Sequence, residues 1–143
     1  VLPLVGGSFA RLLAGAATGR LDASAVSREP GAALSVAVVD EGYPETPTGG
    51  GTLDGLDDLM RGGDVMIFHA GTAFADGRWR VRGGRALHVA ARGATVAEAR
   101  ERVYAAVDRL GGRGWRCRRD IAAGGASVDA SAVVSGAGGP TCR

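Results

Sequence analysis

Two strand-like apolar runs stand near the middle of the chain, at residues 65–68 and 86–91, and polar turns separate them. The turns contain Asp76-Gly77 and Gly83-Gly84, dipeptides that supply the positive φ angles of tight reversals. A third short run, residues 78–81, falls between these turns. The pattern predicts an antiparallel meander of short strands.

A helix is predicted after the meander. Thr95 and Glu98 have the spacing of a capping box, in which each side chain accepts a free backbone amide at the helix start. Apolar residues then recur at helical spacing, namely Val96, Ala99, Val103, Val107 and Leu110. Tyr104 lies one step off this stripe and is expected at its edge. The helix is expected to cover one face of the sheet.

The region before the meander contains a helix, a connection and a strand. Ser8 is a suitable N-cap for a helix over residues 9–17, and Gly19 follows its end. The polar residues 20–31 are expected to form a surface connection. Residues 32–39 are almost continuously apolar, which predicts a central strand covered on both faces.

The C-terminal region divides into a short strand and a tail. Residues 115–121 are predicted to form an edge strand, and residues 122–143, rich in Ala, Gly and Ser, to be disordered. The fold class expected from these elements is α+β, a small, mostly antiparallel sheet or barrel-like meander with a covering helix.

Composition restricts the chemistry. All 17 basic residues are Arg, so a phosphate-loop Lys and Schiff-base chemistry are both excluded. A net charge of +2 without aromatic residues interleaved in a basic patch gives no prediction of nucleic acid binding. The sequence has no apolar run of membrane-spanning length, and Cys117 and Cys142 are expected to stay reduced. A cytoplasmic protein is predicted.

The candidate chemistry lies at the turns of the meander. His69, Gly71 and Thr72 follow one apolar run, and Arg85 follows two glycines. A guanidinium beside glycines can hold an anion, because backbone amides can share the bound oxygens. The alternative is structural: His69 would cap the strand end, Gly71 would form the turn and Arg85 would be solvated.

Taken in order, these motifs resemble the C-terminal part of the phosphoribosylamine-glycine ligase family of the ATP-grasp superfamily. The resemblance covers about residues 1–121. It rests on Val1-Leu2-Pro3-Leu4, Gly19-Arg20-Leu21-Asp22, Gly42-Tyr43-Pro44, Phe68-His69-Ala70-Gly71-Thr72, Asp76-Gly77, Gly83-Gly84-Arg85 with Leu87 and Val89, the helix from Thr95 with Glu98, Ala99 and Tyr104, and Arg118-Arg119-Asp120-Ile121.

The resemblance implies part of an ATP-dependent ligase that joins phosphoribosylamine and glycine into glycinamide ribonucleotide in purine biosynthesis. Residues 1–22 would be the end of the ATP-grasp domain, a helix and its exit. Residues 23–121 would form the C-terminal domain bordering the substrates, and residues 122–143 the tail. ATP and Mg or Mn would bind the full enzyme but not this chain alone, which is expected to be an inactive fragment whose partner is the ATP-grasp domain.

The resemblance also implies roles for residues. Arg85, His69, Gly71 and Thr72 would face the substrate cleft, with Arg85 the better candidate for an anionic group. No catalytic or metal-binding residue is predicted. Gly42-Tyr43-Pro44 is expected to be a rigid turn, and Arg118, Arg119 and Asp120 a structural ion-pair edge.

The sequence departs from the family pattern in three places. Asp40 and Glu41 replace small residues and would repel phosphate if they faced it, and Arg82 replaces a Thr. The low-complexity tail is a further departure. The alternative function is a non-catalytic binding or structural module that pairs with a separate ATP-grasp chain.

Overall fold

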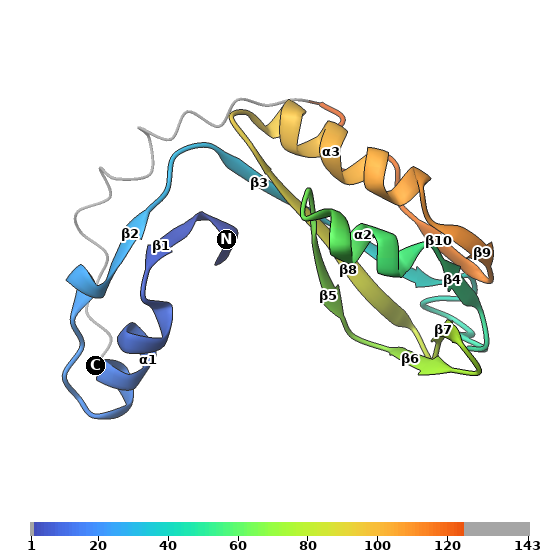
Figure 1. Cartoon of the computed structure of the whole chain (residues 1–143), viewed down its shortest axis with the longest axis horizontal. Helices are drawn as coiled ribbons and strands as arrows, with labels where there is room; N and C mark the ends of the chain where they lie inside the picture. The colour runs from blue at the N-terminus through green and yellow to red at the C-terminus, as the bar shows by residue number, and fades with distance from the viewer. Residues whose placement is uncertain (1, 125–143) are drawn as a thin grey trace.

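The computed structural model describes residues 2–124, and Figure 1 shows an N-terminal unit beside a larger body. The unit contains η1 (Leu2–Leu4), β1 (Val5–Gly7), α1 (Phe9–Ala17), η2 (Ala23–Ala25) and β2 (Val26–Arg28). The predicted first helix is confirmed, because the Ser8 side chain accepts the Arg11 amide at its start. A plain connection over residues 20–31 is wrong, since β2 lies there and pairs antiparallel with β1.

The larger body contains two antiparallel sheets and two helices. The first sheet has the order β10-β3-β8-β5 and the second the order β6-β7-β4-β9. The first consists of β3 (Ala32–Asp40), β5 (Met66–His69), β8 (Arg85–Gly93) and β10 (Trp115–Cys117). The second consists of β4 (Thr52–Asp54), β6 (Thr72–Ala75), β7 (Arg78–Val81) and β9 (Gly111–Arg113). With α2 (Leu56–Gly62) and α3 (Val96–Asp108), the α+β class is confirmed.

The strand pairing differs from the predicted meander. β5 pairs directly with β8, so Phe68 lies opposite His88. The predicted middle strand, β7, pairs instead with β6 and β4 in the second sheet. The reason is that residues 72–75 form a strand of their own and reverse into β7 through Asp76 and Gly77, whose φ angles are +52° and +71°. β5 then pairs along its whole length with β8.

Helix α3 covers one face of the first sheet, as predicted (Figure 1). The Thr95 hydroxyl accepts the Glu98 amide at 3.2 Å, and a Glu98 carboxylate oxygen accepts the Ala94 amide at 2.7 Å. The capping box is therefore confirmed, with its second bond one residue earlier than in the usual pattern. Tyr104 is buried in the core, so its predicted place at the edge is wrong.

Strand β3 is fully covered on one face and only partly on the other, which corrects the prediction of two covered faces. Val36 and Val38 point into the core and are almost completely buried. On the opposite face Ser35 is exposed, and Ala37 and Val39 are only half-buried. On that second face η1 lies over the first half of the strand, near Ala33 and Ser35, and the small apolar side chains beyond it line a groove.

Strand β10 lies at the edge of the first sheet, which confirms the predicted edge strand, although it ends at Cys117 and not at residue 121. It pairs antiparallel with β3, placing Cys117 opposite Val38. The predicted disorder of residues 122–143 falls almost entirely outside the described residues.

Candidate functional site

The three turn motifs of the sequence meet at one end of the first sheet. The Gly71 amide donates to the Arg85 carbonyl at 2.9 Å, and the Arg82 amide donates to the Gly71 carbonyl at 2.8 Å. The Asp40 amide, just before Gly42, donates to the Gly84 carbonyl at 2.7 Å. Backbone hydrogen bonds therefore bring together segments that are far apart in the sequence.

Gly71 is required by a close approach of two backbones. A Cβ atom at this position would lie 2.8 Å from the Arg85 carbonyl oxygen, inside van der Waals contact. The amide of Gly71 also donates to the Ala86 carbonyl. The role of this glycine is thus to let the turn after β5 pack against the start of β8.

The side chains of His69 and Arg85 lie on opposite faces of the first sheet. His69 pairs with Leu87, which is buried in the core, and antiparallel partners share a face. Arg85 would share that face by simple alternation. A β-bulge between Val38 and Val39 shifts the register, so that Arg85 pairs with Val39 on the outer face. The backbone segments of the predicted site residues therefore lie close together, but the His69 and Arg85 side chains point to opposite faces of the sheet.

His69 and Thr72 belong to a small cluster between the two sheets. The His69 Nδ1 lies 2.6 Å from the Thr72 hydroxyl, and its Nε2 lies 3.5 Å from the Met60 sulfur. The imidazole stacks on Trp79 with 4.6 Å between ring centroids. The Trp79 indole in turn donates to Asp57 at 2.8 Å. These contacts favour the structural interpretation of His69.

Arg85 lines a groove of about 590 Å³ on the outer face of the first sheet. Its basic lining residues are Arg85, His88, Arg116 and Arg118, its apolar ones include Val39, Pro44 and Ile121, and no carboxylate lines it within residues 2–124. Arg118 is paired with Asp120, and Arg116 donates to the Tyr43 carbonyl. In the part of the chain that the structure describes, the Arg85 guanidinium has no hydrogen-bond or ion-pair partner. Arg85 is thus available for an anion.

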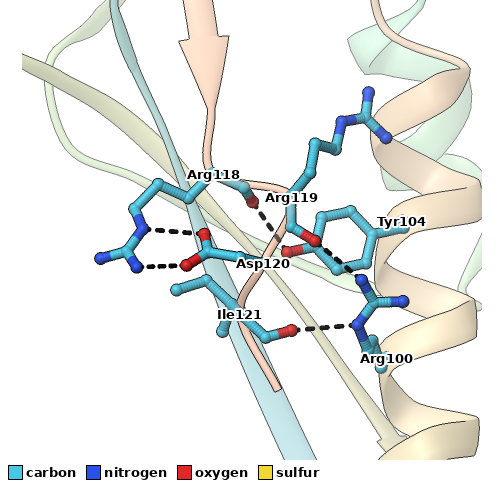
Figure 2. Close-up of polar contacts among 6 residues, drawn as sticks. All are labelled: Arg100, Tyr104, Arg118, Arg119, Asp120 and Ile121. Carbon is cyan, nitrogen blue, oxygen red and sulfur yellow. Dashed lines mark hydrogen bonds and ion pairs between the residues drawn. The ribbon is translucent and has the colours of Figure 1, made fainter. Parts of the chain in front are cut away.

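The far rim of the groove is fixed to α3, as Figure 2 shows. The Tyr104 hydroxyl donates to the Arg118 carbonyl at 2.7 Å. Arg100 donates to the carbonyls of Arg119 at 2.7 Å and Ile121 at 3.0 Å. These bonds hold the segment after β10 so that Arg118 and Ile121 line the groove. The predicted ion-pair edge is present, although Arg119 pairs with Asp108 instead of Asp120.

Asp40 neither lines the groove nor faces an anion within it. Its side chain is buried, and it accepts backbone amides from Gly42 at 2.9 Å, Thr48 at 3.2 Å and Gly49 at 2.9 Å. The Gly42 amide, aided by the other two, lowers the pKa of the Asp40 carboxyl below its usual value, against the opposing effect of burial. Asp40 is therefore not placed to repel a phosphate in the groove, and its role is structural.

Asp40 should make stability depend on pH in the acid range. Because its folded pKa is lowered, its contribution is complete above the unfolded value of about 4 and is lost as the pH falls through the folded pKa. We expect Asp40→Asn to be less stable than wild type at pH 7, with a difference that shrinks toward about pH 2.5. Urea unfolding at a series of pH values measures this. A difference that is constant with pH would contradict the assignment.

The groove includes residues that the sequence did not single out as functional. His88 is a lone polar side chain within the apolar run of β8, and its Nδ1 lies 3.5 Å from the Ser35 hydroxyl. A polar residue inside an otherwise apolar strand indicates an outward-facing position. That signal could have identified the outer face. Tyr43 was expected only as part of a rigid turn and also lines the groove.

Residues 2–124 have neither a cluster of three metal-ligand side chains nor a helix able to cross a membrane. No three His, Cys, Asp or Glu side chains gather in this part of the chain in a way that could hold a metal ion. None of its helices is long and apolar enough to cross a membrane.

Comparison with known proteins gives a consistent result. Residues 33–124 match the family described as phosphoribosylglycinamide synthetase, C domain. The phosphoribosylamine-glycine ligase of Phenylobacterium zucineum is 50% identical over 91 residues, which are 63% of this chain and 21% of that protein. The ligase of Mesorhizobium japonicum is 44% identical over 110 residues, 77% of this chain and 26% of that protein.

A solved structure supports the same relationship. The crystal structure of phosphoribosylamine-glycine ligase from Thermotoga maritima superposes with a TM-score of 0.64 at 29% identity, covering 78% of this chain and 27% of that chain. This chain therefore spans about a quarter of the length of the relatives that it matches.

Proposed function

This chain belongs to the phosphoribosylglycinamide synthetase C-domain family, and we propose that it is the C-terminal part of an ATP-dependent ligase. The full enzyme would join phosphoribosylamine and glycine to give glycinamide ribonucleotide in purine biosynthesis. The relatives support this proposal through their names, since they are phosphoribosylamine-glycine ligases. Because they carry the matching region within one longer chain, they do not favour the alternative of a separate module.

The observation that carries the proposal is the groove with its unpaired arginine. Phosphoribosylamine and glycinamide ribonucleotide each have a phosphate, and a guanidinium can hold a phosphate through paired, charge-assisted hydrogen bonds. Arg85 would bind that phosphate, and Gly71 would allow the turn beside it to pack closely. The placement of His69 and Thr72 at the substrate cleft stays a prediction, and their contacts between the two sheets favour a structural role.

The described residues do not fit a magnesium nucleotide, because they offer neither a Lys nor a cluster of acidic ligands. ATP and Mg or Mn would therefore bind elsewhere in the full ligase, and this chain would contribute no step through them. The chain by itself would be catalytically inactive. The location in the cytoplasm stays a prediction.

The partner of this domain would be the ATP-grasp domain of the same enzyme. Residues 1–22 would be the end of that domain, residues 23–121 the substrate-bordering domain and residues 122–143 a tail. The family match starting at residue 33 is consistent with a change of domain before it. Exposed apolar side chains of residues 1–22, Leu2, Phe9 and Leu13, would contact the rest of the ATP-grasp domain.

Arg85 gives the direct test. Calorimetric titration of the chain with glycinamide ribonucleotide should show binding, and Arg85→Ala should weaken it by about tenfold or more, the usual effect of losing a charge-assisted hydrogen bond. Arg92→Ala is the matched control, because Arg92 is also exposed on β8 but lies outside the groove. Titration with ATP should give no binding heat.

Two results would contradict the proposal. Equal affinity of wild type and Arg85→Ala would remove Arg85 from the substrate site. A wild-type chain that does not bind glycinamide ribonucleotide would mean that the groove holds no substrate by itself.

A further inference from the structure

The loop over residues 41–49 forms one wall of the groove. Tyr43 and Pro44 from this loop line the groove together with Arg85 from β8. The loop leaves β3 directly after Asp40 and returns toward the second sheet, where the Gly50 amide donates to the Val81 carbonyl at 2.8 Å. The shape of the groove therefore depends on what holds this loop against β8.

Asp40 contacts both the loop and β8. Its carboxylate accepts the amides of Gly42, Thr48 and Gly49, which closes the two ends of the loop onto one buried side chain. Its own amide donates at 2.7 Å to the carbonyl of Gly84, the residue before Arg85. One residue thus connects the loop to the strand that carries the unpaired guanidinium.

The ring of Tyr43 is seated on the same glycine. A Cβ atom at Gly84 would lie 2.8 Å from the Tyr43 Cδ2, so the ring packs directly on the Gly84 backbone. Arg116 donates to the Tyr43 carbonyl and supports this placement from β10. Tyr43 belongs to the loop whose two ends the Asp40 carboxylate joins, so closure of the loop supports this position.

We propose that Asp40 is a positioning residue, which closes the 41–49 loop and so fixes the Tyr43 wall of the groove beside Arg85. Both carboxylate oxygens are needed, because together they accept all three amides. An Asn side chain has one acceptor oxygen, and its NH₂ donor group would face a backbone N–H. The role in ligand binding rests on the proposed function of the groove. The effect on groove shape does not.

The test compares Asp40→Asn with Asp58→Asn, which removes an exposed carboxylate on α2, outside the groove. The first readout is the NMR cross-relaxation between the Tyr43 ring protons and the Gly84 α-protons. It should be strong in the wild type, clearly weakened in Asp40→Asn and unchanged in Asp58→Asn. The second readout is the Kd for glycinamide ribonucleotide, which should rise about fivefold or more in Asp40→Asn alone, equivalent to about one lost hydrogen bond.

Strong Tyr43–Gly84 cross-relaxation in Asp40→Asn would overturn the proposal, and so would an unchanged Kd in a variant whose Tyr43 ring has moved away from Gly84. If Asp40→Asn does not fold, Asp40→Ser serves as the second variant, because it is smaller and should show the same two changes. Failure of the proposed function looks different. In that case the wild type does not bind the nucleotide or Arg85→Ala binds normally, and the cross-relaxation readout still decides whether Asp40 shapes the groove.

Discussion

Replacement of Leu87 by alanine is expected to lower the free energy of unfolding by about 2–5 kcal/mol. Leu87 is fully buried near the start of β8, opposite Val38 of β3 and His69 of β5. Leu87 belongs to the close-packed core cluster that β8 shares with β3 and α3, so neighbouring groups can close the resulting cavity only partly. The substitution removes buried methyl groups at the centre of the core.

Urea unfolding followed by circular dichroism measures the effect, which should appear as a lower midpoint with an unchanged slope. The control is Leu21→Ala. Leu21 is 66% exposed, and the change should cost less than about 0.5 kcal/mol. If both variants lost the same stability, β8 would not be the centre of the core.

Replacement of Gly112 by alanine is expected to cost about 2–4 kcal/mol, the sum of two separate effects. The φ angle of Gly112 is +97°, which L-residues with a side chain rarely adopt. A Cβ atom there would also lie 2.1 Å from the Thr52 carbonyl oxygen, so β9 and β4 would have to move apart. Gly112 pairs with Leu53 in this sheet.

Gly77→Ala separates the two effects. Gly77, with a φ angle of +71°, lies in the turn between β6 and β7, and a Cβ atom there would have nothing within 4 Å. Only the backbone cost of about 1–2 kcal/mol should therefore appear. Thermal unfolding of the two variants gives the comparison. A Gly112→Ala protein as stable as Gly77→Ala would show that β9 does not approach β4 as closely as described.

The groove and the core make different demands on the chain. The core face of the first sheet is covered by α3, whereas its outer face is contacted by η1 at one end and carries Arg85, His88 and small apolar residues in the groove at the other. In the proposed ligase this outer face would border the substrate and the preceding domain. Leu87, Gly112 and Gly77 do not line the groove, so their substitutions should leave the groove-lining residues in place.

The sequence by itself determined the elements whose signals are local. Helix α1 follows Ser8, helix α3 follows the Thr95 capping box, and β10 was correctly predicted as an edge strand. Caps and periodicity act over a few residues, and they can therefore be read without knowing what packs against the element. The α+β class and the family resemblance were available from the same local motifs.

The sequence also identified the turns that meet near Arg85, because glycines at fixed places restrict the backbone. It did not show which side chains share a face. The bulge between Val38 and Val39 moves Arg85 to the outer face and separates it from His69. A shift of one residue in register reverses the direction of every following side chain, and nothing in the residues on either side indicates it.

Only the tertiary structure decided the pairing of β5 with β8, the exposure of one face of β3, and the role of Asp40. Each depends on contacts between residues distant in sequence: Phe68 with His88, and Asp40 with Thr48 and Gly49. The sequence of a strand is apolar whether its second face is covered or lines a groove. A carboxylate is likewise charged in the sequence whether it faces solvent or three backbone amides. The sequence contains the side chains, but their surroundings exist only once the chain has folded.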